Sequence, residues 1–86
     1  MTDPELASLR VYSRPGCHLC EQLIEQLLPM IRGRLELDVV NIDTRPEWQE
    51  EFGTRVPVVE FAGQFVCQYS LDEVEIRRIL ADLIAS

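Results

Sequence analysis

The chain has 86 residues, of which 47% are hydrophobic, and its formal net charge at pH 7 is −7. This length and composition predict one folded domain over residues 1–86 and exclude an intrinsically disordered chain. The acidic charge, carried against eight scattered Arg and no Lys, argues against nucleic acid and anionic lipid as partners.

The N-terminal stretch MTDPELASLR contains two acidic residues and lacks the apolar core of a secretory signal. No apolar run further along approaches the roughly 20 residues that cross a bilayer, so no membrane contact is expected. Three Cys are an odd number, whereas disulfide-rich secreted scaffolds use even sets. These features predict a cytoplasmic protein, in which a Cys pair is more often catalytic or metal-binding than structural. Residues 1–8 are expected to be loosely ordered.

The first half of the chain predicts a strand, a turn and a helix. Residues 9–13 form a short, bounded run of β type, and Arg14–Gly16 form a turn. From Cys17 onward, apolar residues recur every three or four positions, as on one face of an amphipathic helix. Pro29 would remove a helical hydrogen bond, so this helix is expected to end near Leu28 or to kink there.

The middle of the chain predicts a second strand and a short helix. Residues 35–42 alternate between apolar and polar and then run apolar, which indicates a strand. Residues 43–52 have Pro and acidic residues near their start, which is typical of the first turn of a helix. Asp43 or Thr44 is expected to cap that helix.

The end of the chain predicts a hairpin and a long helix. Residues 58–61 and 64–69 are rich in β-forming residues and flank a turn at Ala62–Gly63. Ser70 and Glu73 have the spacing of a capping box at the start of the last helix.

The order of elements is therefore β-α-β-α-β-β-α, which belongs to the α/β class. The first β-α-β unit is expected to make a right-handed crossover and a parallel strand pair, whereas the late hairpin is antiparallel. The sequence predicts a four-stranded mixed sheet with three helices on its faces.

Two cysteines, Cys17 and Cys20, lie just after the first strand and open the first helix. At the first helical position, the sulfur of Cys17 would lie near unpaired N–H groups and the positive end of the helix dipole, which favour a thiolate. Arg14 and a charged His18 act in the same direction, so the pKa of Cys17 is expected to fall below about 8.5. Cys20 lies on the apolar face and is expected to be more buried. This pattern predicts attack by Cys17 on a disulfide and resolution of the mixed disulfide by Cys20.

Other hypotheses for this motif stay open at this point. Both cysteines can be packing residues, or they can bind metal. A closed zinc site needs four ligands, and the Cys and His candidates are Cys17, His18, Cys20 and Cys67. An iron–sulfur or metal carrier that uses Cys17 across two chains is one alternative function. A non-catalytic module that holds a partner at the edge near Val56–Pro57 is another.

The late hairpin contains two further residues of interest. Pro57 opens a strand, where its missing N–H is tolerated. Only about 5–6% of X–Pro bonds in folded proteins are cis, so the residues alone favour a trans bond. Cys67 is expected to be buried and inert on the last strand, with Phe65 and Tyr69 on the same face.

Taken together, the stretches YSRPGCHLC and RVPVVEF resemble the glutaredoxin branch of the thioredoxin fold. The first is similar to that family's strand, Lys-Pro-X turn and C-x-x-C motif, with Arg14 at the Lys position. The second is similar to its Thr-Val-Pro segment, and the order of elements agrees over nearly the whole chain. The greatest likeness is to small bacterial glutaredoxin-like proteins.

The resemblance implies that Pro57 is cis and faces Cys17, and that the backbone of Val56 pairs with the backbone of the substrate. It also implies a dithiol–disulfide oxidoreductase that acts on a protein or glutathione mixed disulfide. We expect a monomer with no bound cofactor or metal, and glutathione is a candidate reductant or co-substrate.

Three departures from the family pattern bear on the substrate. His18-Leu19 replace the usual Pro-Tyr, and Arg55 replaces a Thr. Tyr69-Ser70 replace the two Gly of a Gly-Gly-X-Asp-Asp segment, and a Cβ at either position would crowd glutathione lying close to the backbone. Conversely, Arg14 and Arg55 would give the acidic protein a local positive rim suited to a carboxylate. The residues expected to contact the substrate are Arg14, His18, Arg55, Val56, Pro57 and Asp72.

Overall fold

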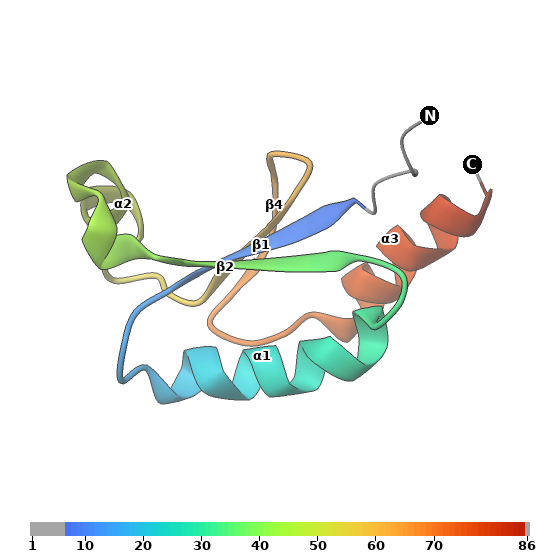
Figure 1. Ribbon diagram of the computed structural model, residues 1–86, viewed down its shortest axis with the longest axis horizontal. Helices are drawn as coiled ribbons and strands as arrows, with labels where there is room; N and C mark the ends of the chain where they lie inside the picture. The colour runs from blue at the N-terminus through green and yellow to red at the C-terminus, as the bar shows by residue number, and fades with distance from the viewer. Residues whose placement is uncertain (1–6, 86) are drawn as a thin grey trace.

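The computed structural model describes residues 7–85. The elements along the chain, shown in Figure 1, are β1 (Ser8–Ser13), α1 (His18–Ile31), β2 (Glu36–Asn41), the 3-10 helix η1 (Ile42–Thr44), α2 (Pro46–Phe52), β3 (Val58–Phe61), β4 (Gln64–Gln68) and α3 (Glu73–Ala85). Apart from η1, this order is the predicted one. The loose order predicted for residues 1–8 falls largely outside the described residues. Ser8, the last residue of this range, belongs to β1.

The four strands form one mixed sheet in the order β2-β1-β3-β4. β1 pairs with β2 in parallel and with β3 antiparallel, and β3 pairs with β4 antiparallel. Val11 lies between Val39 of β2 and Val59 of β3 in this register. The predicted fold class is therefore confirmed, and β2 forms one edge of the sheet.

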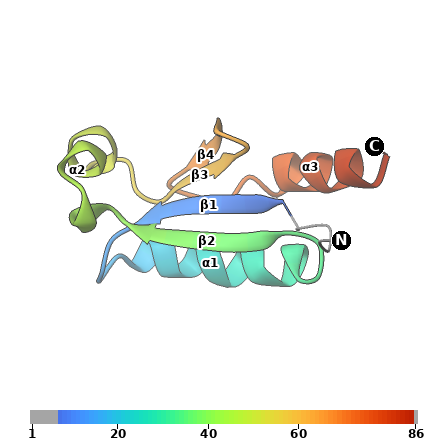
Figure 2. The same cartoon turned by 45° about the horizontal axis from the view of Figure 1, so that its top comes forward.

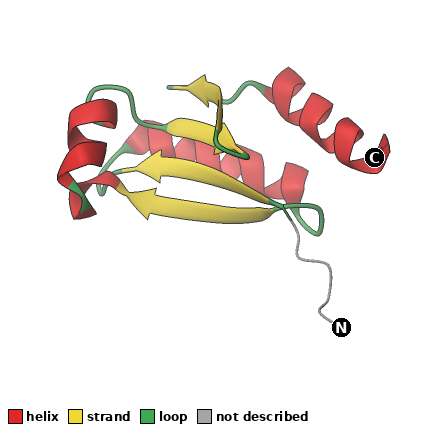
Figure 3. Cartoon of the chain, turned by 90° about the horizontal axis from the view of Figure 1, so that it is seen from above, coloured by secondary structure: helices red, strands yellow, loops and turns green. Residues whose placement is uncertain are grey.

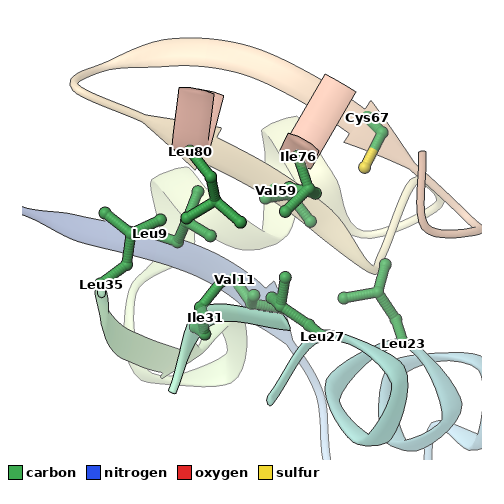
Figure 4. Close-up of a cluster of buried hydrophobic side chains, with 10 residues drawn as sticks. All are labelled: Leu9, Val11, Leu23, Leu27, Ile31, Leu35, Val59, Cys67, Ile76 and Leu80. Atoms are coloured by element: carbon green, nitrogen blue, oxygen red, sulfur yellow. The ribbon is translucent and has the colours of Figure 1, made fainter. Parts of the chain in front are cut away.

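Most of the core lies between one face of the sheet and helices α1 and α3. Figure 4 shows this cluster, and Figures 2 and 3 show α1 running along the sheet. Its buried members are Leu9, Val11, Leu23, Leu27, Ile31, Leu35, Val59, Cys67, Ile76 and Leu80. The opposite face carries a smaller cluster with α2, formed by Tyr12, Ile42, Phe52 and Val58. This arrangement places α2 beyond the carboxyl ends of β1 and β2, the end at which α1 begins (Figure 2).

Helix α1 continues through Pro29 and ends at Ile31, so of the two predicted alternatives, an end or a kink near Leu28, the end is wrong. Pro29 lies in the last turn, where a missing N–H costs only one hydrogen bond. Ile31 is 1% exposed and lies one turn beyond the fully buried Leu27 on the same face. Burial of that apolar side chain outweighs the lost bond.

Neither Asp43 nor Thr44 caps α2, contrary to prediction. The N-cap of α2 is Arg45, which makes no side-chain cap hydrogen bond, and Pro46 takes the first helical position. Asp43 N–H instead donates to the side chain of Asn41, which caps η1. Asp43 and Thr44 instead belong to the 3-10 helix η1, which the sequence pattern did not reveal.

The predicted capping box between Ser70 and Glu73 is also absent from the start of α3. The helix begins at Glu73, and the carboxylate of Asp72 accepts a hydrogen bond of 3.1 Å from the N–H of Glu75. Ser70 N–H donates to the carbonyl of Gln68 in a tight turn. Ser70 therefore belongs to the turn, and the cap shifts two residues along the chain.

A bulge in β4 separates Cys67 from Phe65. Val59 pairs with Cys67, but the next residue, Glu60, pairs with Phe65, so β4 has one extra residue at this point. Cys67 consequently points into the core and is 7% exposed, whereas Phe65 is 56% exposed. The prediction that Cys67 shares its face with Phe65 is wrong for this reason, and Tyr69 lies beyond the end of β4.

Candidate functional site

Cys17 is the N-cap residue of α1, one position earlier than expected. Its Sγ accepts a hydrogen bond of 3.1 Å from the backbone N–H of Cys20. The chain reaches this position through Gly16, whose φ of +77° is a left-handed conformation that Gly adopts easily. The N–H of Cys17 donates to the carbonyl of Arg14 across the turn. The sequence around the turn thus places a sulfur where a helix offers unpaired N–H groups.

The sulfurs of Cys17 and Cys20 are joined in a disulfide, with their Cα atoms 5.2 Å apart. Cys20 is 1% exposed, whereas Cys17 is only partly buried. The expectation that Cys20 is the more buried of the two is confirmed. An incoming sulfur can therefore reach Cys17 more readily than Cys20.

Arg14 ties the loop before Cys17 to the chain on either side of α2, at the same end of the sheet. Its Nη2 and Nε donate to Oδ1 of Asp43 at 3.0 and 3.2 Å, and its Nη1 donates to the carbonyl of Gly53 at 3.3 Å. The positive charge expected at the rim is therefore paired with a carboxylate in this structure. Asp43 is a site residue that the sequence analysis missed, because this pairing joins positions 29 residues apart.

The Val56–Pro57 peptide bond is cis, as the resemblance implied. The N–H of Val56 donates to the carbonyl of Phe52 at 3.1 Å, so this donor is already paired within the protein. Tyr69 lies against the same segment. Its N–H donates to the carbonyl of Pro57 at 2.8 Å, and its hydroxyl donates to the carbonyl of Thr54 at 3.2 Å.

Tyr69 is also one of two residues other than Gly with a positive φ in the part of the chain that the structure describes. Its φ of 71° is a left-handed conformation that costs a residue with a Cβ about 1–2 kcal/mol. The contacts to Thr54 and Pro57 hold it there. Tyr69 thus forms two hydrogen bonds with the backbone of residues 54–57, which include the segment that the resemblance assigned to the substrate.

Arg55 is held between two aromatic rings. Its guanidinium carbon lies 5.4 Å from the ring centre of Phe52 and 5.9 Å from that of Phe65. Its Nε donates to the side-chain oxygen of Gln68 at 2.9 Å. Arg14 contacts the carbonyl of Gly53 and Arg55 contacts the ring of Phe52, so both arginines lie near the end of α2.

His18 and Asp72 contact other parts of the chain. The side chain of His18 is 93% exposed, with Nδ1 3.7 Å from Oε1 of Glu21. Asp72 caps α3 and lines a separate recess with Cys67. Burial raises the pKa of the Cys67 thiol, although a hydrogen bond from the Asp72 backbone opposes the shift. Cys67 thus has the environment of an inert core residue.

A recess of about 310 Å³ lies directly beside Cys17, between α1 and β2. Ile24 and Val39 contribute its apolar lining, and Arg14 and Glu21 also border it. Neither residue was singled out from the sequence, because each fits the apolar pattern of its helix or strand. Only the edge position of β2 leaves Val39 47% exposed.

Two features of the described chain bear on other classes of function. Among residues 7–85, no three His, Cys, Asp or Glu side chains are grouped so that one chain could hold a metal ion. Within the same residues, no helix is both long and apolar enough to cross a membrane.

The family model described as "Glutaredoxin-like domain (DUF836)" matches residues 8–81. Uncharacterized proteins of Mycobacterium tuberculosis and Mycobacterium bovis are each 32% identical over 93 residues, covering 100% of this chain and 89% of theirs.

Solved structures agree with this relationship. The solution structure of protein Ne2328 from Nitrosomonas europaea has a TM-score of 0.76 at 34% identity and covers 92% of this chain and 96% of its own. Protein XcR50 from X. campestris has a TM-score of 0.68 at 30% identity, with coverages of 86% and 96%. The holo form of glutaredoxin C1 from Populus tremula x tremuloides shares the fold, with a TM-score of 0.59 at 23% identity and coverages of 90% and 86%. The chain therefore belongs to the glutaredoxin-like domain family of the thioredoxin fold.

Proposed function

We propose that the protein is a dithiol–disulfide oxidoreductase in which Cys17 is the nucleophile and Cys20 the resolving residue. The observation that carries this proposal is the placement of the Cys17 sulfur as the cap of α1, bonded to a nearly inaccessible Cys20. In the reduced protein, the Cys20 N–H and the helix dipole would both stabilise a Cys17 thiolate. A thiolate is the form of cysteine that attacks disulfides.

The proposed reaction has two exchange steps. The Cys17 thiolate attacks one sulfur of the substrate disulfide, a mixed disulfide forms, and the other substrate sulfur leaves as a thiolate that takes up a proton. Cys20 then loses its proton and attacks Sγ of Cys17, which releases the second substrate sulfur as a thiol. The substrate gains two electrons and the protein ends with the Cys17–Cys20 disulfide, which an external thiol must reduce before the next cycle.

The remaining predicted site residues have supporting roles in this proposal. Arg14 fixes the loop that carries Cys17 through its contacts with Asp43 and Gly53. In this proposal the segment Arg55–Pro57 and the exposed His18 contact the substrate, as the family resemblance implies. Asp72, whose carboxylate caps the start of α3, is a further substrate contact in this proposal. The proposed substrate is a protein or glutathione mixed disulfide.

Disulfide turnover by a set of serine variants tests this proposal. We expect Cys17→Ser to abolish turnover of a peptide disulfide, and Cys20→Ser to accumulate a mixed disulfide on Cys17 that mass spectrometry detects. Cys67→Ser is the matched control and should retain turnover, because Cys67 is a buried free cysteine that takes no part in the disulfide. Turnover that survives in Cys17→Ser would contradict the proposal. Partner capture that does not require Cys17 would favour a non-catalytic binding module instead.

A further inference from the structure

The recess beside Cys17 has an apolar part that no residue of the described chain covers completely. Val39 lies on the α1 side of the sheet, since it pairs with the core residue Val11. Its side chain is nevertheless 47% exposed, and the partly buried Ile24 borders the same recess from α1. Figure 2 shows β2 above α1, with the loop to Cys17 at the end of both. An apolar surface thus leads directly to Cys17.

The backbone N–H and C=O groups of Val39 in β2 point away from the rest of the sheet. Within residues 7–85, β2 pairs on one side only, with β1. The N–H of Glu36 donates to the carbonyl of Ala7, on the β1 side. Since the N–H direction alternates along a strand, the N–H and C=O of Val39 point away from β1. Unpaired groups of this kind at a sheet edge accept an added strand.

The charges around the recess disfavour a small anionic ligand. Arg14 borders the recess, but Asp43 already accepts two hydrogen bonds from its guanidinium. Glu21 adds a carboxylate, and the whole chain carries a net charge of −7. A neutral or basic segment with an apolar side chain fits these surroundings better than a ligand with several carboxylates.

We infer that the substrate of this site is a protein whose disulfide segment docks as an added strand on β2. Its apolar side chain occupies the space between Ile24 and Val39, and its cysteine lies at Cys17. Backbone pairing to Val39 holds the segment in register. This inference rests on the proposed function and names its substrate class: an extended, apolar and neutral or basic segment of a protein.

Amide exchange in a trapped complex locates the docked segment. The probe is a synthetic peptide with one Cys, a Leu two residues away and Arg at both ends, joined to Cys17 of Cys20→Ser as a mixed disulfide. We expect the N–H of Val39 to exchange more slowly in the complex than in the free protein, because the peptide backbone pairs with it. Slowed exchange confined to the N–H groups of Arg55, Val56 and Tyr69 would overturn the inference.

A specificity ratio gives a second readout. We compare kcat/KM for the disulfide dimer of this peptide with kcat/KM for oxidised 2-mercaptoethanol. In Val39→Thr, which keeps a strand-forming residue, the ratio should fall roughly fivefold. Val74→Thr is the matched control, since Val74 is a 66% exposed Val on α3, and it should leave the ratio unchanged. An unchanged ratio in Val39→Thr would overturn the inference alone, whereas no turnover of either disulfide would overturn the proposed function as well.

Discussion

The backbone N–H of Cys20 donates a hydrogen bond to Sγ of Cys17 over 3.1 Å. An oxygen of Ser, Thr, Asp or Asn makes this bond in most helix caps. The reactive sulfur is therefore part of the structure that begins α1, and its chemistry and the stability of the helix are linked. Each substitution at Cys17 tests both properties.

The capping role predicts a difference between two variants that both remove the thiol. We expect Cys17→Ala to lower the free energy of unfolding by about 1 kcal/mol relative to Cys17→Ser, because only the hydroxyl can accept the Cys20 N–H. Urea unfolding of both variants under reducing conditions measures this difference. Equal stability would contradict a capping role for the side chain at position 17.

The ion pair between Arg14 and Asp43 predicts a change in substrate preference. Asp43→Ala would leave the Arg14 charge uncompensated beside Cys17, so the reaction with the anionic glutathione disulfide should become about threefold faster at low salt. The loss of stability should stay below about 1 kcal/mol, because the two side chains are 38% and 41% exposed.

Asp38→Ala is the control for that measurement. Asp38 pairs with Arg10 at 3.0 Å with similar exposures of 46% and 43%, but this pair lies at the middle of β1 and β2 rather than beside Cys17. A comparable rate increase in both variants would mean that net charge alone changes the rate.

Tyr69 predicts how readily glutathione reacts. Tyr69→Gly removes the ring that reaches Thr54, so we expect the rate with glutathione disulfide to rise several-fold relative to a neutral disulfide. Ala62→Gly is the control, since Ala62 also has a positive φ, of 52°, and lies in the hairpin turn. It should raise the free energy of unfolding by up to about 1 kcal/mol without changing the rate. An unchanged rate in Tyr69→Gly would show that Tyr69 does not restrict the site.

The buried thiol of Cys67 predicts a loss of stability in alkaline solution. Burial raises the pKa of Cys67 in the folded protein. The unfolded chain loses this proton near pH 8.5 while the folded protein keeps it, so stability falls as pH rises from about 7.5 to about 9.5. Cys67→Ala, with the Cys17–Cys20 disulfide intact, should show a smaller fall over this range. Urea unfolding at a series of pH values measures the free energy of unfolding of both proteins. An equal fall in the two proteins would rule out a contribution of Cys67.

Local patterns in the sequence were sufficient for the order of elements and for the placement of the two cysteines. Both depend on residues close together in the chain: the change from alternation to a helical period at Cys17, and the turn residues that precede it. The cis bond at Pro57 followed only from the family resemblance, because the residues around it do not determine the isomer.

Features that depend on contacts between distant residues could not be predicted. Asp43 was predicted to be a helix cap because it lies just before α2 in the sequence. Its actual partner, Arg14, belongs to a distant loop, so local patterns could not reveal the pairing. The bulge that turns Cys67 into the core arises from the register between β3 and β4. Nothing in the pattern of residues 35–42 distinguishes Val39, and the order of strands places it at an edge, in the recess beside Cys17.

The most direct test of the central claim is the pH dependence of alkylation of Cys17 in the Cys20→Ser variant. The backbone N–H of residue 20 remains in this variant, and the buried Cys67 should not react. We expect the rate to reach half its maximum at a pH below about 8.5, because the helix cap stabilises the thiolate. A midpoint at or above about 8.5 would contradict the assignment of Cys17 as an activated nucleophile.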